Sequence, residues 1–363
     1  MKGLARFSPR RAARAGLSKC LCSNICLFLR LVVCLNGAAV AQKALILVGS
    51  GSTVPAPIYR RWAQEYGKQS MGIQMRYLPE GTDVGIKQIS HGAGDFSAGE
   101  AQLTEEDRTA AGLIELPVVV IAIVPIYNLP DVQQDLRLSG EVLAAIFLGE
   151  VRSWNAPQIA KLNPEITLPN LAIRVINRPA GKGSNCVFTD FLSKASSKFR
   201  EQIGRTSSPK WPLGKSAQRS SDMVEQVKNR PGSLGYVEYQ YAVKADIHRA
   251  SVLNSAGKFV KASVESISAA CRGAEAPRWN NLSASLVDAS GADSFPITSF
   301  SWIYLRTLSA DPAHAAELRN LLNWIYTDGQ QYGVQEGYAE LPEPLLLAVR
   351  RKAQELRLVA PLP

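Results

Sequence analysis

The sequence predicts an α/β protein with two lobes, and three observations support this prediction. From residue 44 onward, short apolar runs alternate with loops and amphipathic segments, which is the pattern of a mostly parallel sheet flanked by helices. Two longer apolar runs, Val118–Val124 and Phe295–Leu305, are typical of buried strands. Because these runs lie far apart in the sequence, we expect the chain to cross from one lobe to the other and return.

The first elements follow from local signals. An apolar run at Ala44–Val48 predicts a strand, which ends in a Gly/Ser-rich loop at 49–55. A helix is expected next, because Pro55 and Pro57 suit a first helical turn and three large side chains then repeat at helical spacing. These three side chains are Ile58, Trp62 and Tyr66.

The remaining elements continue this alternation. Alternating or continuous apolar residues predict strands, and apolar residues on a single face predict helices. Besides the two long runs, the further expected strands are Ile73–Tyr77, Asp95–Ala98, Ala172–Ile176 and Ser233–Val243. The expected helices are Val84–Ser90, Gly140–Leu148, Val187–Lys194 and a C-terminal segment with Leu318, Leu321, Leu322 and Ile325 on one face.

The positive charge of the chain is concentrated at its N-terminus. The formal net charge is +10 over 363 residues, and residues 1–41 contain seven basic and no acidic residues. A basic start, an apolar stretch interrupted by Arg30 and the ending Ala39-Val40-Ala41 are typical of a secretory signal peptide cleaved near Ala41. A membrane anchor is the alternative, but the apolar run falls short of the roughly 20 residues that a spanning helix needs.

Without this leader, the rest of the chain has a modest charge and few cysteines. Residues 42–363 carry a formal charge of +3 and no basic stripe, which disfavours nucleic-acid binding. The hydrophobic fraction of 46% excludes intrinsic disorder. Cys186 and Cys271 could pair in an oxidising compartment, although we favour two separate buried thiols.

Three strand-to-helix loops have the composition of an anion site. They contain Ser52-Thr53-Val54, Gly81-Thr82 and Gly183-Ser184-Asn185, and Arg178 precedes the third. Backbone N–H groups at a helix N-terminus bind anions, hydroxyls add donors, and arginine presents a planar fork that fits an oxyanion. One such loop is an ordinary turn, but three of them favour binding of a small oxyanion.

Signatures of enzymes and nucleotide binding are weak. Gly214-Lys215-Ser216 has Pro209 where a phosphate-binding P-loop requires glycine. The three histidines, His91, His248 and His314, do not have the spacing of metal ligands. We therefore expect neither enzymatic activity nor a cofactor or metal.

Four segments resemble the phosphate-specific substrate-binding proteins of ABC transporters, the periplasmic phosphate-binding protein family. They are G-S-G-S-T-V-P-A-P-I-Y-R-R-W-A at 49–63, I-F-L-G-E-V-R-S-W-N-A-P-Q-I at 146–159, G-S-L-G-Y-V-E-Y at 232–239 and D-G-Q-Q-Y-G at 328–333. The resemblance covers nearly all of residues 45–345. It implies the type II periplasmic-binding-protein fold, with two α/β lobes joined by a hinge and a ligand cleft between them.

The resemblance also implies the division of the chain and its ligand-binding residues. Lobe 1 would comprise residues 42–120 and 294–363, and lobe 2 would comprise residues 121–293. The residues that match the phosphate ligands of the family are Thr53, Val54, Thr82, Glu100, Arg178, Gly183 and Ser184. The carboxylate explains selectivity, because it accepts a hydrogen bond from a protonated oxyanion such as hydrogen phosphate but not from sulfate.

Several positions depart from the family pattern. Glu100 replaces aspartate, Ala180 replaces an aspartate that holds the arginine, and Lys182 replaces a ligand-binding serine. Asp83 stands where another serine is usual, so Lys182 and Asp83 are further ligand candidates. Either Lys182 contacts the anion and Asp83 or Glu100 holds Arg178, or Lys182 points to solvent, which we favour.

The expected function is therefore capture of inorganic phosphate in the periplasm for a membrane ABC permease. The protein is expected to be a monomer that binds no nucleic acid. The departures leave another tetrahedral oxyanion open as the ligand. An exported phosphate-ester hydrolase is a rival, with Ser184, Thr53 or Cys186 as nucleophile, but no histidine lies near them in the sequence.

Overall fold

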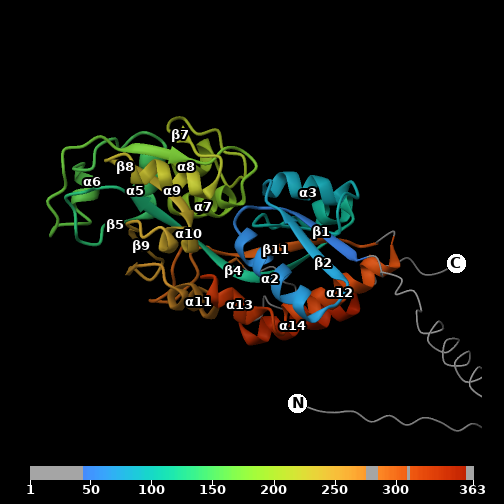
Figure 1. The fold of residues 1–363 in the computed structure, drawn as a ribbon. Helices are drawn as coiled ribbons and strands as arrows, with labels where there is room; N and C mark the ends of the chain where they lie inside the picture. Colours follow the sequence, from blue (N-terminus) through green and yellow to red (C-terminus); the bar gives the residue numbers. More distant parts are fainter. Residues whose placement is uncertain (1–43, 275–284, 309–310, 357–363) are drawn as a thin grey trace, which may run out of the picture. The chain divides into compact units, whose positions relative to one another are not determined.

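The computed structural model describes residues 44–274, 285–308 and 311–356 (Figure 1). The chain divides after Ala44 into two units, and the described helices and strands belong to the second unit, Leu45–Pro363. The expected signal peptide lies outside the described residues. Among the helices that are described, none has the length and apolar character needed to cross a membrane.

An eight-stranded mixed sheet forms the centre of this unit, with strand order β2-β1-β3-β11-β4-β8-β6-β7. Its strands are β1 (Leu45–Gly51), β2 (Ile73–Leu78), β3 (Phe96–Gly99), β4 (Leu113–Tyr127), β6 (Arg174–Asn177), β7 (Lys215–Ser216), β8 (Ser233–Glu238) and β11 (Thr298–Arg306). A smaller sheet contains β5 (Arg137–Leu138), β9 (Ser251–Leu253) and β10 (Phe259–Val260).

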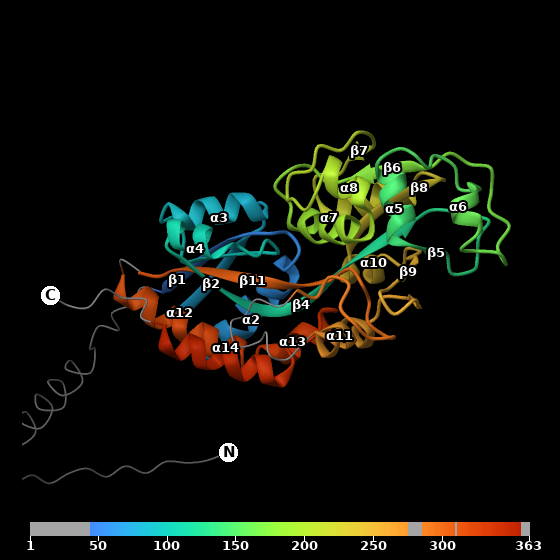
Figure 2. The same cartoon turned by 180° about the vertical axis from the view of Figure 1, so that it is seen from behind.

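Helices connect the strands and cover the sheet. In Figures 1 and 2, α12, α13 and α14 lie along one side of β4 and β11, and α3 lies on the other side. The first helices are α2 (Ala56–Gln69), α3 (Thr82–Ser90), α4 (Glu105–Ala111), α5 (Gly140–Phe147), α6 (Pro157–Ala160), α7 (Gly183–Ala195) and α8 (Ser197–Gln202). The later ones are α9 (Ser220–Lys228), α10 (Tyr239–Lys244), α11 (Val264–Gly273), α12 (Pro312–Ile325), α13 (Gln330–Gln335) and α14 (Glu343–Glu355).

The long strand β4 joins the two halves of the sheet. Its first part, residues 113–122, pairs with β11, and residues 123–127 pair with β8. Both predicted buried runs are thus confirmed as strands in the middle of the sheet. The sheet is less parallel than expected, because the returning strand β11 runs antiparallel to both β3 and β4, and β4 runs antiparallel to β8.

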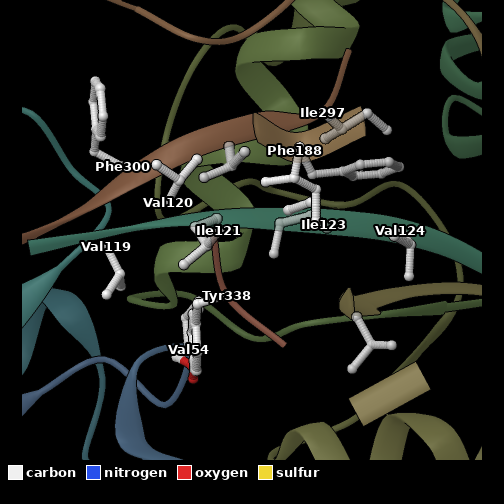
Figure 3. Packing of buried hydrophobic residues seen from close by; sticks show 14 of the residues in the cluster. Val54, Val119, Val120, Ile121, Ile123, Val124, Phe188, Ile297, Phe300 and Tyr338 are labelled. Atoms are coloured by element: carbon white, nitrogen blue, oxygen red, sulfur yellow. The ribbon is translucent and has the colours of Figure 1, made fainter. Parts of the chain in front are cut away.

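The hydrophobic core follows β4 through both halves of the sheet. Its residues Val118–Val124 are almost fully buried. Figure 3 shows five of them, Val119, Val120, Ile121, Ile123 and Val124, with Ile297 and Phe188 on one side of the strand and Val54 and Tyr338 on the other. The Tyr338 hydroxyl donates a hydrogen bond to the Val54 carbonyl oxygen at 2.8 Å. Core packing therefore fixes the first candidate loop directly against β4.

Two predicted elements differ from the structure. The expected strand Ser233–Val243 ends at Glu238, and residues Tyr239–Lys244 form the helix α10. The β-propensity of its tyrosines and valine is overridden because the pairing with β4 ends at Glu238, opposite Ile123. The helix expected at Val187–Lys194 begins already at Gly183, so that residue and Ser184 belong to the first turn of α7.

The two cysteines of the described chain are separate buried thiols, as the sequence favoured. Neither Cys186 nor Cys271 forms a disulfide, and both are more than nine-tenths buried. Burial raises the pKa of each thiol to about 12, so both are protonated at neutral pH.

Candidate functional site

Three neighbouring strands present candidate residues at a common edge of the sheet. β1 and β2 are each followed by a candidate loop and β3 by Glu100, and because the three strands run parallel, these residues meet at the carboxyl ends of the strands. The Ser52 N–H donates to the Ala98 carbonyl at 2.8 Å, and the Gly81 N–H donates to the Gly51 carbonyl at 2.7 Å. These bonds hold the loops after β1 and β2 beside the end of β3.

Glu100 lies at the centre of this cluster. It follows β3 directly, and only 2% of its surface is exposed. Ser52 Oγ donates to Glu100 Oε2 at 2.6 Å, and Ser301 Oγ donates to Oε1 at 3.0 Å. Thr82 Oγ1 approaches Oε2 at 3.4 Å, so serine and threonine hydroxyls hold the carboxyl group in place.

Burial changes the proton affinity of this carboxyl group. Loss of hydration raises the pKa of Glu100 to about 8, against the lowering effect of the hydrogen bonds from Ser52 and Ser301. The charge of Glu238 raises this pKa further. Glu100 is therefore mainly protonated at neutral pH, when its O–H can donate a hydrogen bond, and mainly an acceptor above pH 8.

Arg178 reaches the cluster from the other half of the sheet. It follows β6 and is 1% exposed, and its Nη2 donates to Thr53 Oγ1 at 3.1 Å. Its Nε and Nη1 atoms are buried without a hydrogen-bond partner among the described residues. Buried guanidinium groups normally use their donors in hydrogen bonds, so these two N–H positions mark a place for an acceptor.

Polar contacts fix the loop that carries Arg178. The Arg178 N–H donates to the Tyr236 hydroxyl at 3.1 Å, and this hydroxyl donates to Asn185 Oδ1 at 2.5 Å. The Asn185 amide group donates in turn to the carbonyls of Pro179 and Ser207 at 2.8 and 2.9 Å. These hydrogen bonds therefore hold the loop without the aspartate that the resemblance would place at position 180.

Gly183 makes the closest approach between this loop and Glu100. A Cβ atom at position 183 would lie 1.7 Å from Glu100 Oε2 and 2.5 Å from Thr82 Oγ1. No side chain larger than hydrogen fits at this distance, so glycine is required sterically. The first turn of α7 thus packs directly against the buried carboxyl group.

Replacing Gly183 by alanine is expected to lower the affinity for the anion about tenfold to a hundredfold, because the added methyl group separates α7 from Glu100. The free energy of unfolding should also fall, by about 1–3 kcal/mol, because the methyl group overpacks this contact. Calorimetric titration and thermal melts measure the two effects. Gly67→Ala is the matched control, because a Cβ atom there meets only the Ile73 carbonyl oxygen, at 3.8 Å. Unchanged affinity in Gly183→Ala would contradict the prediction.

Lys182 and Asp83 form two further contacts between the loops. Lys182 is half-buried, and its Nζ donates to the Glu80 carbonyl oxygen at 3.1 Å, so the favoured orientation toward solvent is wrong. Burial and the nearby charge of Arg178 lower the pKa of Lys182. The Asp83 carboxylate accepts hydrogen bonds from the hydroxyls of Ser207 at 2.7 Å and Ser208 at 3.2 Å, rather than from Arg178.

The remaining candidates lie in the same cluster. Ser184 is the second residue of α7, and its hydroxyl is buried without a hydrogen-bond partner among the described residues. Thr53 contacts Arg178 as described above. The Val54 N–H, which the resemblance implies as a ligand donor, donates to Ser52 Oγ at 3.1 Å. The structure thus brings the candidate residues from the three loops and Glu100 together.

Sequence reasoning missed several residues of this cluster. Ser52 stands in the quoted loop motif, next to a predicted ligand, and could have been included. Ser301 lies opposite Glu100 because β11 pairs with β3 through Trp302 and Gly99, a contact between distant segments that no local pattern indicates. Glu238 and Tyr236 lie in the quoted segment 232–239, but as parts of a strand they gave no chemical signal.

The histidines that could serve as a base for hydrolysis have other partners. His314 contacts Asp95, His91 contacts the Lys87 carbonyl, and His248 stacks on Tyr127. Cys186 is a protonated thiol at neutral pH, as described above. Among the residues that the structure describes, no group of three metal-ligating side chains is found.

A family model described as a PBP superfamily domain matches residues 36–329 of the chain. The phosphate-binding protein PstS of Pasteurella multocida is 34% identical over 321 residues, which cover 88% of this chain and 93% of the relative. The phosphate-binding protein PstS of Haemophilus influenzae is 34% identical over 309 residues, which cover 85% of this chain and 92% of the relative.

Solved structures show the same fold. PfluDING, a high-affinity periplasmic phosphate-binding protein bound with phosphate, superposes with a TM-score of 0.70 at 16% identity. The match covers 88% of this chain and 100% of the PfluDING chain. An ABC-type phosphate transport receptor from Vibrio cholerae gives a TM-score of 0.54 at 15% identity, and the match covers 81% of this chain and 99% of the receptor chain. The fold is the type II periplasmic-binding-protein fold. With this fold and these relatives, the chain belongs to the PBP superfamily, in the family of the PstS phosphate-binding proteins.

Proposed function

We propose that this protein captures inorganic phosphate between the two halves of its sheet and delivers it to an ABC-type permease. The observation that carries this proposal is the buried guanidinium of Arg178, whose Nε and Nη1 donors have no hydrogen-bond partner among the described residues. A cation in a site with little water binds an anion strongly, because the charge-assisted hydrogen bonds are not weakened by solvent. The relatives, phosphate-binding proteins, support phosphate as this anion.

Each candidate residue then has a defined role. Arg178 binds phosphate oxygens through its fork, and the Ser184 and Thr53 hydroxyls donate further hydrogen bonds. The N–H groups of Gly183 and Ser184 lie in the first turn of α7, which is a favourable place for an anion. Thr82 completes the cradle, and the Val54 N–H, which in this structure donates to Ser52 Oγ, is its remaining candidate donor. Lys182 and Asp83 hold the loops together around it.

The division of the chain into lobes explains how phosphate is enclosed. We assign residues 42–120 with 294–363 to lobe 1 and residues 121–293 to lobe 2, with β4 as part of the hinge. Contacts between residues 53 and 178, 80 and 182, and 83 and 207 then join the lobes. An anion that binds both lobes stabilises this closed arrangement, because it interacts more strongly with the closed state than with an open one.

The site of action follows from the same proposal. An exported protein of this kind works in the periplasm, where PfluDING is also placed. We propose that residues 1–41 are a signal peptide that is removed near Ala41 and that the mature protein is a monomer. Its partner is the membrane permease, and neither an enzymatic step nor nucleic-acid binding is part of this function.

Calorimetric titration of the mature protein with phosphate, arsenate and sulfate tests the proposed function. Above pH 8, where Glu100 is mainly ionised, phosphate is expected to bind in the micromolar range or tighter and at least tenfold more tightly than sulfate, because sulfate has no proton to donate to the carboxylate. A preference for arsenate would change the identity of the ligand. Equal affinity for sulfate and phosphate, or no binding of any of these anions, would refute the proposal.

A further inference from the structure

Glu238 is a second buried carboxylate in the region of the anion site. It is 1% exposed, and neither of its carboxylate oxygens has a hydrogen-bond partner among the described residues. A buried carboxylate without partners is costly, so such a group in a folded protein calls for a physical explanation. Neither the fold nor the residues proposed to bind phosphate account for it.

The topology places Glu238 next to the cradle. β6 and β8 run parallel and end at the same edge of the sheet, where Arg178 follows β6 and Glu238 is the last residue of β8. Just beyond it, the Gln240 side-chain amide donates to the Val54 carbonyl oxygen at 3.1 Å. The segment that carries Glu238 therefore runs beside the end of β6, which Arg178 follows, and then contacts the loop of Val54.

The electrostatic surroundings agree with this position. The charge of Glu238 contributes to the raised pKa of Glu100, for which burial is the main cause. The pKa of Tyr236 is raised mainly by burial, and the charges of Arg178 and Glu238 act on it in opposite directions. The charge of Glu238 acts on Glu100, Tyr236, Tyr241 and Tyr338. The two cations of this neighbourhood act on the same tyrosines, Arg178 on Tyr236 and Tyr241 and Arg60 on Tyr241.

Arg178 has hydrogen-bond donors without an acceptor, and Glu238 has acceptors without a donor. In the described part of the chain, the Nε and Nη1 donors of the guanidinium and both oxygens of the carboxylate are buried without hydrogen-bond partners, so these groups do not bond to each other. A tetrahedral oxyanion that carries protons matches this arrangement, because its oxygens accept from Arg178 while its hydroxyl groups donate to carboxylates. An anion without protons would find only repulsion at Glu238.

From these contacts we infer that Glu238 is a second hydrogen-bond acceptor for the bound oxyanion, so that the filled site holds two protons between the anion, Glu100 and Glu238. This inference rests on the proposed function and specifies the protonation state of its ligand. The two protons can be written as dihydrogen phosphate between two carboxylates, or as hydrogen phosphate beside one protonated carboxyl group and one carboxylate. Because the groups are coupled, phosphate, Glu100 and Glu238 share the two protons.

The inference has a consequence for proton balance. Above pH 8, the empty protein has lost the proton of Glu100, and free phosphate carries one proton. A filled site with two protons must then take up one proton from solution for each phosphate bound. The affinity should fall about tenfold for each pH unit above this point. A site with Glu100 as its one acceptor would take up none, and its affinity would stay constant.

Calorimetric titration of the mature protein with inorganic phosphate at about pH 9, in two buffers of different ionisation enthalpy, measures this proton uptake directly. The wild type is expected to take up about one proton per phosphate, and Glu238→Gln and Glu238→Ala are expected to take up almost none. The control is Glu201→Gln, which removes an exposed carboxylate of α8 and should behave as the wild type does.

The possible results separate this inference from the proposed function. Absence of phosphate binding to the wild type at any pH would refute the function itself. Phosphate binding without proton uptake in the wild type, or with the same uptake in both Glu238 variants, would overturn the inference alone. A constant wild-type affinity above pH 8 would overturn it even if both variants failed to fold.

Discussion

Replacing Arg178 by alanine is expected to weaken phosphate binding by about 2–5 kcal/mol, which is a loss of roughly 30-fold to 5,000-fold in affinity. The reason is that Arg178 is buried, with two N–H positions free for an acceptor and a third donor group held by Thr53 at 3.1 Å. Water cannot replace these donors fully in a buried site. The lost interaction therefore appears almost completely as lost affinity.

Calorimetry and the thermal shift caused by phosphate measure this effect. Arg178→Lys is the informative second variant, because it keeps the charge but loses the planar fork, and it should retain an intermediate affinity. The melting temperature without phosphate reports whether each variant folds. Wild-type affinity in a folded Arg178→Ala protein would show that the anion binds elsewhere.

The strand order and the site depend on different kinds of sequence information. Local patterns predicted β1, β4 and β11 because apolar runs bounded by turn residues are short-range signals. The prediction for the segment after Glu238 is wrong, because its tyrosines and valine favour a strand but its pairing with β4 ends opposite Ile123, and Ala339 pairs with β4 at Val120 instead. Pairing partners, which the local pattern does not contain, decided the conformation there.

The candidate site was predicted as far as it lies in loops with a recognisable composition. Arg178, Thr53, Thr82 and Ser184 stand in such loops or are matched by the resemblance. The positions of Ser301 and Glu238 follow from strand register between segments that are distant in sequence, so composition gives no indication of them. The same holds for the orientation of Lys182, whose contact with Glu80 requires that both loops come together.

Replacing Glu100 by glutamine is expected to stabilise the empty protein, by an amount that grows with pH. The pKa of Glu100 is about 8 in the folded protein against 4.5 for an ordinary glutamate, mainly because burial disfavours the charged form. The folded protein thus binds this proton more tightly than the unfolded chain does. The contribution of the Glu100 proton to the free energy of unfolding is fully present below pH 4.5. It is lost as the pH rises to about 8.

Urea unfolding of phosphate-free protein at about pH 5 and pH 8, followed by tryptophan fluorescence, measures this difference. The free energy of unfolding of Glu100→Gln should exceed that of the wild type only slightly at the lower pH. At the higher pH the excess should reach about 3–5 kcal/mol. Glu201→Gln, the variant at an exposed position, should show no such trend.

The opposite result would have a clear structural meaning. If the wild type kept its stability relative to Glu100→Gln up to pH 8, Glu100 would be ionised in the folded protein at neutral pH. The hydrogen bonds from Ser52 and Ser301 would then outweigh the cost of burial. Glu100 would act as a hydrogen-bond acceptor throughout the neutral range, and discrimination against sulfate would not depend on pH there. If the predicted trend is observed, this discrimination should instead sharpen as the pH rises through about 8, where the carboxyl group changes from donor to acceptor.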